Sequence, residues 1–369
     1  MDLKEAREEI RRVDEEMAAL LVRRMEAVRE VAVYKREHGL PIEDREQEAR
    51  VISGRSALIT DPELRPFYVR FLQSAMDVSK LWQRRLMEGL RIAYSGVEGA
   101  FAHIAARRIF PTGTPVPFPS FEAAYEAVVN GDCDLAVIPI ENSYAGEVGQ
   151  NIDLMFTGSL HVNGVYDLSV TQNLLGLPGA SLEQVHTVLS HPQALAQCAG
   201  YIRSRGFAMR SAENTALAAR EVARQTDPGL AAIASAETAE LYGLRILDHD
   251  INESKANTTR FAVFSRSQRA PTEKREGGAF LLLFTVKDEV GALARAISII
   301  SAHHFNMRVL RSRPVKTLPW HYYFYAEVEG DDASEDGQRM LDALRGVCTT
   351  VRVAGRYTAE HAIQGGESI

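Results

Sequence analysis

The sequence has little cysteine, no long apolar run and no excess of positive charge, and each shortage excludes a class of protein. Its 369 residues include only three cysteines, Cys133, Cys198 and Cys348. They have neither the spacing of metal ligands nor the even number of a disulfide framework, so we expect them to pack as thiols. The net charge of −7 argues against nucleic acid as a partner, because binding to phosphates needs clustered Lys and Arg.

No stretch is long and apolar enough to predict a membrane-spanning helix. The N-terminus, Met1-Asp2-Leu3-Lys4-Glu5, is charged where a signal peptide would become apolar. We therefore expect a cytoplasmic location and no membrane partner. The composition, 46% hydrophobic and 25% charged, is typical of a folded protein, and the length predicts two or three domains.

Residues 2 to 37 contain neither Gly nor Pro, and apolar side chains recur there at helical spacing. A single helix of this length would extend about 50 Å at about 1.5 Å per residue, more than a small monomeric domain can cover. A partner chain or a helical bundle is therefore expected. On a helical wheel, Arg24 and Lys35 fall within the apolar stripe. Either they bind a buried anion or their side chains extend to solvent.

Two further helices are predicted in this region, one from Asp44 to Leu58 and one from Pro62 to about Met87. In the latter, Ser79 and Gln83 lie on the face otherwise formed by apolar residues. A polar pocket inside a helical bundle accounts for these groups together with the two cations of the first helix.

Residues 1 to 89 resemble the all-helical class of chorismate mutase. That family rearranges a dianion to prephenate without proton transfer, so it needs fixed positive charge and hydrogen-bond donors. The resemblance implies that Lys35 and Gln83 act on the ether oxygen as catalytic groups. Where the family usually has an arginine, this chain has Gln47. The implied chorismate-binding residues are Arg7, Arg24, Lys35, Asp44, Glu48, Ser79 and Gln83.

From Arg91 onward the pattern changes to alternating strands and helices. Strands are predicted over residues 92–94, 135–138, 165–170, 185–189, 231–233 and 260–264. This alternation predicts an α/β region of two lobes.

The stretch 134–146 combines an apolar run, a proline and polar residues. We expect Pro139 to end a buried parallel strand. Glu141 and Asn142 would then lie at the carboxyl edge of the sheet, where open α/β sheets bind ligands. Glu141 is a candidate acid whose pKa burial would raise. Alternatively, Asn142-Ser143 caps a helix beside a solvated Glu141.

Ser190-His191-Pro192-Gln193 follows another predicted strand, and Pro192 suits the first position of a helix. Free N–H groups at that terminus would receive a carboxylate. The alternative is ordinary capping with a satisfied His191.

The segments Glu141-Asn142, Ser190-His191-Pro192-Gln193, Gln197 and Thr259-Arg260-Phe261 closely resemble prephenate dehydratase, over residues 90 to 267. That family binds prephenate between two lobes of a periplasmic-binding-protein-like domain. It removes water and carbon dioxide to give phenylpyruvate, without metal or other cofactor. The resemblance implies that Thr259 and Glu141 are catalytic groups for departure of the hydroxyl. The implied prephenate-binding residues are Asn142, Ser190, Gln197, Thr259 and Arg260.

The polar stretch from Gln268 to Gly278 is expected to be a linker. The order of elements predicted over residues 279 to 357 indicates a ferredoxin-like βαββαβ sandwich. Gly291-Ala292-Leu293 and Ser312-Arg313-Pro314 resemble the amino-acid-binding turns of an ACT regulatory domain, although Arg311 stands where that family usually has Glu. The resemblance implies L-phenylalanine as effector. His303-His304 is expected to end a helix, since no further metal ligand is suitably spaced.

The resemblances imply a multidomain enzyme of phenylalanine biosynthesis that converts chorismate to prephenate and prephenate to phenylpyruvate, with feedback by L-phenylalanine. The resemblance implies a homodimer or a higher homo-oligomer, and the long first helix by itself implies a partner chain or a bundle. Two alternatives stay open. One is a sensor of aromatic metabolites without turnover, and the other is a dehydratase with a weakened mutase domain.

Overall fold

The computed structural model describes residues 2–268, 278–358 and 362–363. Contacts within the chain divide it into two units, Met1–Arg91 and Ile92–Ile369. The second unit contains both regions that were predicted as separate domains from residue 90 onward. Most of the predicted linker lies outside the described residues.

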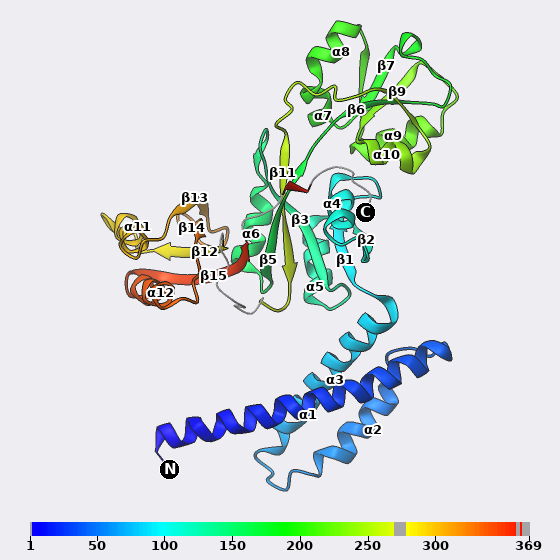
Figure 1. Cartoon of the computed structure of the whole chain (residues 1–369). Coiled ribbons are helices and arrows are strands. Elements are labelled where there is room, and N and C mark those ends of the chain that lie inside the picture. Colours follow the sequence, from blue (N-terminus) through cyan, green and yellow to red (C-terminus); the bar gives the residue numbers. More distant parts are fainter. Residues whose placement is uncertain (1, 269–277, 359–361, 364–369) are drawn as a thin grey trace. The chain divides into compact units, whose positions relative to one another are not determined.

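The first unit is built from α1 (Leu3–Glu37), α2 (Arg45–Ser56) and α3 (Arg65–Glu88), shown in blue in Figure 1. The predicted long helix is confirmed. Asp2 caps α1 by accepting a hydrogen bond from the Glu5 N–H, and Asp44 caps α2 in the same way. Val28 and Ala32 of α1 are buried in this unit.

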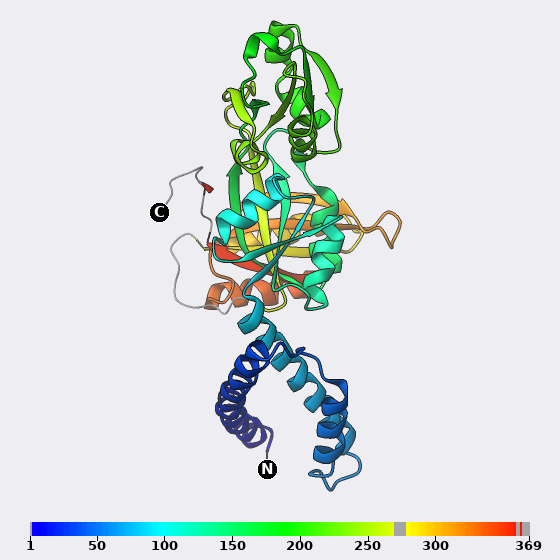
Figure 2. The same cartoon turned by 90° about the vertical axis from the view of Figure 1, so that its right-hand side faces the viewer.

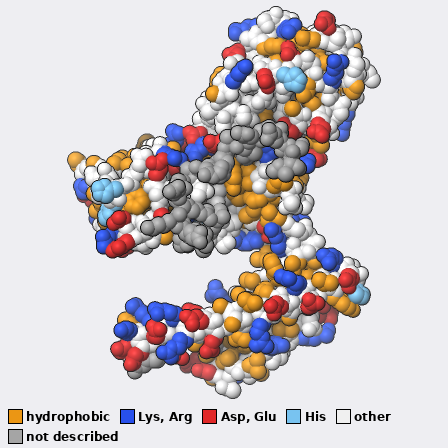
Figure 3. Space-filling model, viewed as in Figure 1, with side chains coloured by type: hydrophobic (Ala, Val, Ile, Leu, Met, Phe, Trp, Pro, Cys, Tyr) orange, Lys and Arg blue, Asp and Glu red, His pale blue; other side chains and the backbone are white. Residues whose placement is uncertain are grey.

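Much of the apolar stripe on α1 is exposed in this single chain. Ile10, Val13, Met17 and Leu20 are 61, 45, 42 and 58% exposed. Figure 3 shows hydrophobic side chains on the surface of these helices. Large apolar side chains in such a row usually mark a surface that another protein covers.

The second unit begins with the strands of a first lobe. They lie in the order β5 (His161–Ser169), β11 (Thr258–Ser265), β3 (Leu135–Asn142), β1 (Arg91–Ser95) and β2 (Thr114–Phe118). Strand β3 runs parallel to β1 and antiparallel to β11. The elements that accompany this sheet are α4 (Phe101–Ile109), α5 (Phe121–Val129), β4 (Gly146–Glu147) and α6 (Gly149–Thr157).

A second lobe carries its own five-stranded sheet. The strand order is β10 (Arg245–Asp248), β6 (Asn173–Gly176), β9 (Leu230–Ala234), β7 (Thr187–Ser190) and β8 (Ala208–Ser211). Its helices are η1 (Leu182–Gln184), α7 (Pro192–Gln197), α8 (Ala199–Arg205), α9 (Thr215–Ala223) and α10 (Ala236–Tyr242). Figures 1 and 2 show this lobe in green, apart from the first sheet. The chain crosses between the lobes at residues 170–172 and 249–257.

The last part of the second unit has the element order βαββαβ. The elements are β12 (Gly278–Val286), α11 (Ala292–Ala302), β13 (Met307–Pro314), β14 (Tyr322–Glu329), α12 (Glu335–Val347) and β15 (Cys348–Thr358). The strands are antiparallel in the order β13-β14-β12-β15. Phe280, Leu282 and Phe284 pack with α11 and α12. Leu281 and Leu283, on the other face of β12, join the apolar core of the first lobe, so this part shares a core with that lobe.

The prediction that Pro139 ends its strand is wrong. Strand β3 continues to Asn142. Its pairing with β1 stops at Val137, so no ladder bond on that edge needs the missing N–H of Pro139. On the other edge, β11 shifts register between Arg260 and Phe261, opposite Pro139. Asn142 is therefore a strand residue and does not cap a helix.

In the part of the chain that the structure describes, no helix is long and apolar enough to cross a membrane. Cys133, Cys198 and Cys348 are all buried, as expected for thiols that pack in the interior.

Candidate functional site

The first unit contains a partly buried cation beside polar groups. Arg24 Nη1 donates to the Ala75 carbonyl at 2.9 Å and also contacts the Ser79 hydroxyl. Gln83, one turn further along α3, is 7% exposed, and its Oε1 has no partner among the described residues. Burial, and then the positive charge of Arg55, lower the pKa of Arg24. A bound anion would relieve both effects, because it would pair with the cation.

The other residues predicted to bind chorismate do not gather around Arg24 in the same way, and each has its own partner among the described residues, or none. Lys35 Nζ donates to the Ile42 carbonyl at 2.6 Å, and Glu48 accepts from Lys80 at 3.2 Å. Asp44 accepts from the Gln47 N–H as the cap of α2. Arg7 is exposed near the start of α1, and this chain does not bring it to Arg24. Sequence reasoning missed Arg55, which no motif had singled out.

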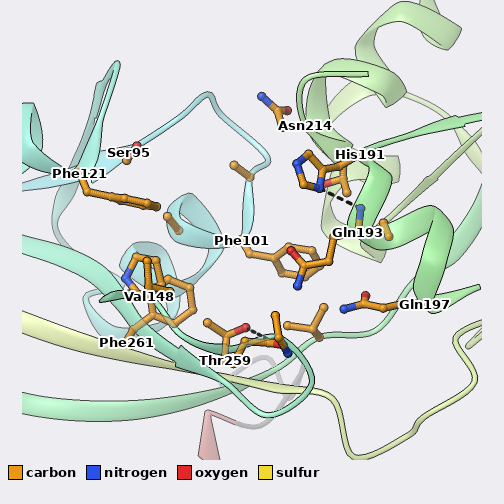
Figure 4. A pocket seen from close by; sticks show the side chains of 18 of the residues that line it. Ser95, Phe101, Phe121, Val148, His191, Gln193, Gln197, Asn214, Thr259 and Phe261 are labelled. Carbon is orange, nitrogen blue, oxygen red and sulfur yellow. Dashed lines mark hydrogen bonds between the residues drawn. The ribbon is translucent and has the colours of Figure 1, made fainter. Parts of the chain in front are cut away.

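A pocket of about 450 Å³ lies between the two lobes of the second unit. The first lobe contributes polar groups from β3 and β11 and the rings of three phenylalanines, whereas the second contributes residues around α7. Figure 4 shows these groups facing one another across the pocket. The lining residues that matter most here are Phe101, Phe121, Asn142, His191, Gln193, Gln197, Thr259 and Phe261.

Thr259 is oriented by Asn142. The amide Nδ2 of Asn142 donates to Thr259 Oγ1 at 2.9 Å and to Asn257 Oδ1 at 3.0 Å. Its Oδ1 accepts from the N–H groups of Tyr144 and Ala145 at 3.0 and 2.8 Å. Because Thr259 Oγ1 already accepts a hydrogen bond, its own hydrogen is available to a molecule in the pocket.

His191 also faces the pocket and caps α7. Its Nδ1 accepts from the Gln193 N–H at 3.2 Å, which assigns the hydrogen of the neutral ring to Nε2. The predicted helix beginning at Pro192 is confirmed. The alternative of capping by His191 is confirmed. The resemblance implied substrate binding by Ser190 and Gln197 and by neither His191 nor Gln193, although these two also line the pocket.

Gln197 and Gln172 form an amide pair at the pocket. Gln172 Nε2 donates to Gln197 Oε1 at 3.4 Å. Gln172 is 2% exposed, and its Oε1 has no partner within the described structure. Sequence reasoning missed Gln172, whose only signal is its position where the chain crosses between the lobes. A buried acceptor without a donor is costly, so a ligand donor would stabilise it.

Three predicted site residues do not line the pocket. The Ser190 hydroxyl is fully buried and donates to the Ile233 carbonyl at 2.6 Å. Glu141 and Arg260 precede and follow the pocket residues Asn142 and Thr259, and alternate residues of a strand point to opposite faces. Pro139 also lines the pocket, and the register shift that leaves Ile140 unpaired turns Glu141 to the opposite face.

On that opposite face, Arg260 and Glu141 contact the βαββαβ part. Arg260 donates to both carboxylate oxygens of Glu327, at 2.9 and 3.2 Å. Burial alone would lower the pKa of Arg260, but the hydrogen bonds and charge of Glu327 raise it. Glu141 forms an ion pair with Arg311.

The predicted effector turns lie at the ends of α11 and β13. Gly291 has φ +77 and caps α11, a conformation that favours glycine. Ala292 is buried, and Ser312 is exposed. The side chain of Arg313 instead contacts Asp153 and Glu147 of the first lobe.

The interlobe pocket, lined by hydroxyl, amide and imidazole groups, is typical of a two-lobed α/β enzyme domain. The same chain carries a helical domain with a partly buried cation, Arg24. The prephenate dehydratase family model matches residues 92–269, and the chorismate mutase type II model matches residues 6–84. The chain belongs to the family of bifunctional chorismate mutase/prephenate dehydratases.

One relative is the bifunctional chorismate mutase/prephenate dehydratase of Enterobacter agglomerans, 31% identical, with 97% of this chain and 96% of that protein covered. Another is arogenate dehydratase/prephenate dehydratase 2 of Arabidopsis thaliana, 34% identical over 73% of both chains. Among solved structures, prephenate dehydratase of Arthrobacter aurescens in complex with L-Phe is 26% identical, with a TM-score of 0.67 and 73% and 90% coverage. The quorum-quenching acylase GqqA is 32% identical, with a TM-score of 0.68 and 73% and 98% coverage.

Proposed function

We propose that the interlobe pocket converts prephenate to phenylpyruvate with Thr259 as the group that assists departure of the hydroxyl. The ring carboxylate leaves as carbon dioxide, its electron pair forms a ring double bond, and the hydroxyl leaves as water after gaining a proton. Thr259 can donate to that hydroxyl because Asn142 occupies its acceptor side. This oriented hydroxyl is the observation that carries the proposal. Gln197 and His191 would bind substrate from the second lobe.

The helical unit is proposed to rearrange chorismate to prephenate. Arg24 would hold a carboxylate, and Lys35 and Gln83 would stabilise the charge that develops on the ether oxygen. The buried, unpaired Gln83 Oε1 and the contact of Arg24 with Ser79 support this site. Arg7 would come from a second copy, since the exposed stripe of α1 offers that copy an apolar surface.

The two reactions are separable by substitution. Arg24→Met should abolish consumption of chorismate and leave dehydration of prephenate unchanged, and Thr259→Val should have the converse effect. Loss of both activities in either variant would contradict two independent sites.

We also propose that the βαββαβ part is an ACT-type sensor of ferredoxin-like topology that binds L-phenylalanine near Gly291-Ala292-Leu293, Ser312 and Pro314. The L-Phe complex of the Arthrobacter relative supports this effector. Arg311 forms an ion pair with Glu141 of the first lobe. Arg311→Glu would therefore place the new carboxylate next to that of Glu141. Calorimetry tests the proposal: binding heat at millimolar phenylalanine is expected, and its absence would refute the sensor.

A second substrate, arogenate, is favoured by the charges at the pocket. Arogenate has an α-amino group where prephenate has a keto group. Among the described lining residues the charged side chains are Glu147 and Glu213, with no Lys or Arg. Glu213 has no ion-pair partner in the described part of the chain, and Gln172 Oε1 offers a second acceptor. The Glu213 carboxylate and Gln172 Oε1 would both accept hydrogen bonds from the ammonium group of arogenate.

Direct formation of phenylalanine from arogenate tests this second substrate. Glu213→Gln should lower kcat/KM for arogenate several-fold relative to prephenate. Glu240→Gln, the same change on α10 away from the pocket lining, should leave the ratio unaltered. Turnover of prephenate without any turnover of arogenate would refute the proposal.

A further inference from the structure

The pocket wall formed by residues 142–148 is held from outside the pocket. Two arginines of β13, Arg311 and Arg313, reach this segment from the βαββαβ part. Alternate residues of a strand share a face, so both point toward the first lobe while Ser312 does not. The wall residues that line the pocket are Asn142, Ala145, Gly146, Glu147 and Val148.

Arg313 is held at several points. Its Nη1 contacts Glu147 Oε1 at 2.5 Å, and its Nε and Nη2 donate to the two oxygens of Asp153 at 2.8 and 3.2 Å. Tyr323 and Lys316 also bind Asp153, at 2.7 and 3.0 Å. The side chains of Arg313 and Asp153 are only 16 and 13% exposed, so salt screens them less than surface charges.

The surroundings of Arg313 favour one position of its guanidinium. Burial by itself would raise the pKa of Asp153, but the hydrogen bonds from Arg313, Tyr323 and Lys316 lower it to about 2. Gly149, the first residue of α6, lies so close to the guanidinium that a Cβ there would overlap with it. Bidentate pairing and close packing therefore fix Arg313, and Arg313 in turn fixes Glu147.

Glu147 is connected to the reacting groups through the backbone. Strand β4 pairs with the end of β3, with Glu147 opposite Glu141 and Gly146 opposite Asn142. Asn142 also accepts from the N–H of Ala145, and its amide orients Thr259. A shift of Glu147 would therefore move the pocket wall against which substrate binds, whereas Asn142 stays anchored by Asn257 and by the Thr258 carbonyl.

We propose that Arg313 is a positioning residue for the dehydratase: through Glu147 it sets the position of the pocket wall and hence the affinity for substrate. The inference rests on the proposed dehydratase function of the pocket. It gives Arg313 a role in pocket geometry in place of the effector contact expected from the ACT resemblance.

Steady-state kinetics with prephenate on the full chain test this role. Arg313→Met should raise KM about tenfold, equivalent to about 1.4 kcal/mol of binding, with kcat changed less than about twofold. Arg308→Met is the matched control, because Arg308 lies on the same strand but pairs with Glu329 within the βαββαβ part. Arg313→Lys keeps the charge and loses the fork, so its KM should be intermediate. Gly149→Ala displaces the guanidinium without removing charge and should also raise KM.

Equal KM values for Arg313→Met and Arg308→Met would overturn the inference, as would a loss confined to kcat. If Arg313→Met does not fold, Gly149→Ala alone decides between the same outcomes. If the unaltered chain turns over no prephenate, the proposed function fails. The contact of Arg313 with Glu147 is then tested by hydrogen exchange of the backbone amides in the pocket wall. Arg313→Met, but not Arg308→Met, should then speed exchange of the amides in residues 143–148. Equal exchange in the two variants would show that Arg313 does not position the wall.

Discussion

Replacing Thr259 by Val removes the hydroxyl that the structure aims at the pocket and keeps the shape of the side chain. The cost to stability should be small, because Asn142 Nδ2 retains the Asn257 Oδ1 and Thr258 carbonyl contacts at 3.0 and 3.3 Å. The cost to catalysis should be large. Loss of a proton-transfer group typically lowers rates by about 10²- to 10⁴-fold, so kcat for prephenate should fall within that range.

The assay follows phenylpyruvate formation at saturating and limiting prephenate. Thr258→Val is the matched control, since Thr258 is the neighbouring residue of β11 and does not line the pocket. It should leave kcat nearly unchanged, and chorismate consumption should be normal in both variants. A Thr259→Val protein with normal kcat and a raised KM would contradict a role for Thr259 in proton transfer, because Thr259 would then bind substrate without serving the chemistry.

Three further predictions concern charged groups. Arg7 and Arg24 are about 25 Å apart along one helix, so mixing Arg7→Ala with Arg24→Ala protein should restore some mutase activity, and proven heterodimers without recovery would contradict action in trans. Gln47→Arg should raise kcat/KM for chorismate, since a charged contact is worth about 1.5–3 kcal/mol against roughly half that for a neutral one; an unchanged value would mean that Arg55 or another group has compensated. The pKa of Asp153, about 2 against an ordinary 3.8, is lowered in the folded state, so its stabilising effect is complete above pH 4 and is lost as pH falls toward 2. Urea unfolding should therefore show a stability gap between the unaltered chain and Asp153→Asn that shrinks by on the order of 1 kcal/mol from pH 5 to pH 3, and a gap independent of pH would contradict this.

Local sequence patterns predicted those helices and strands whose apolar spacing matches their burial in the fold. The long first helix followed from the absence of Gly and Pro over residues 2 to 37, and the buried strands followed from short apolar runs. Strand β2 was missed because Pro115 and Pro117 argue against a strand, yet β2 lies at the edge of its sheet, where proline is tolerated. Strand β8 was missed because its residues are all exposed and lack an apolar pattern.

Residues of the candidate site were predicted correctly where a residue of the motif also faces the pocket in the structure. Asn142, Gln197 and Thr259 line the pocket. Glu141 was expected there too, but the register shift between β11 and β3 leaves Ile140 unpaired and turns Glu141 to the opposite face. The contact of Arg313 with Asp153 joins residues far apart in sequence, which no local pattern encodes.

The most direct measurement is a time course of the purified chain with chorismate as the only substrate. We expect chorismate to disappear, prephenate to appear first, and phenylpyruvate then to accumulate. Binding of chorismate or prephenate without turnover of either would contradict it and would favour a sensor. Turnover of prephenate alone would show that the helical unit no longer supports the rearrangement.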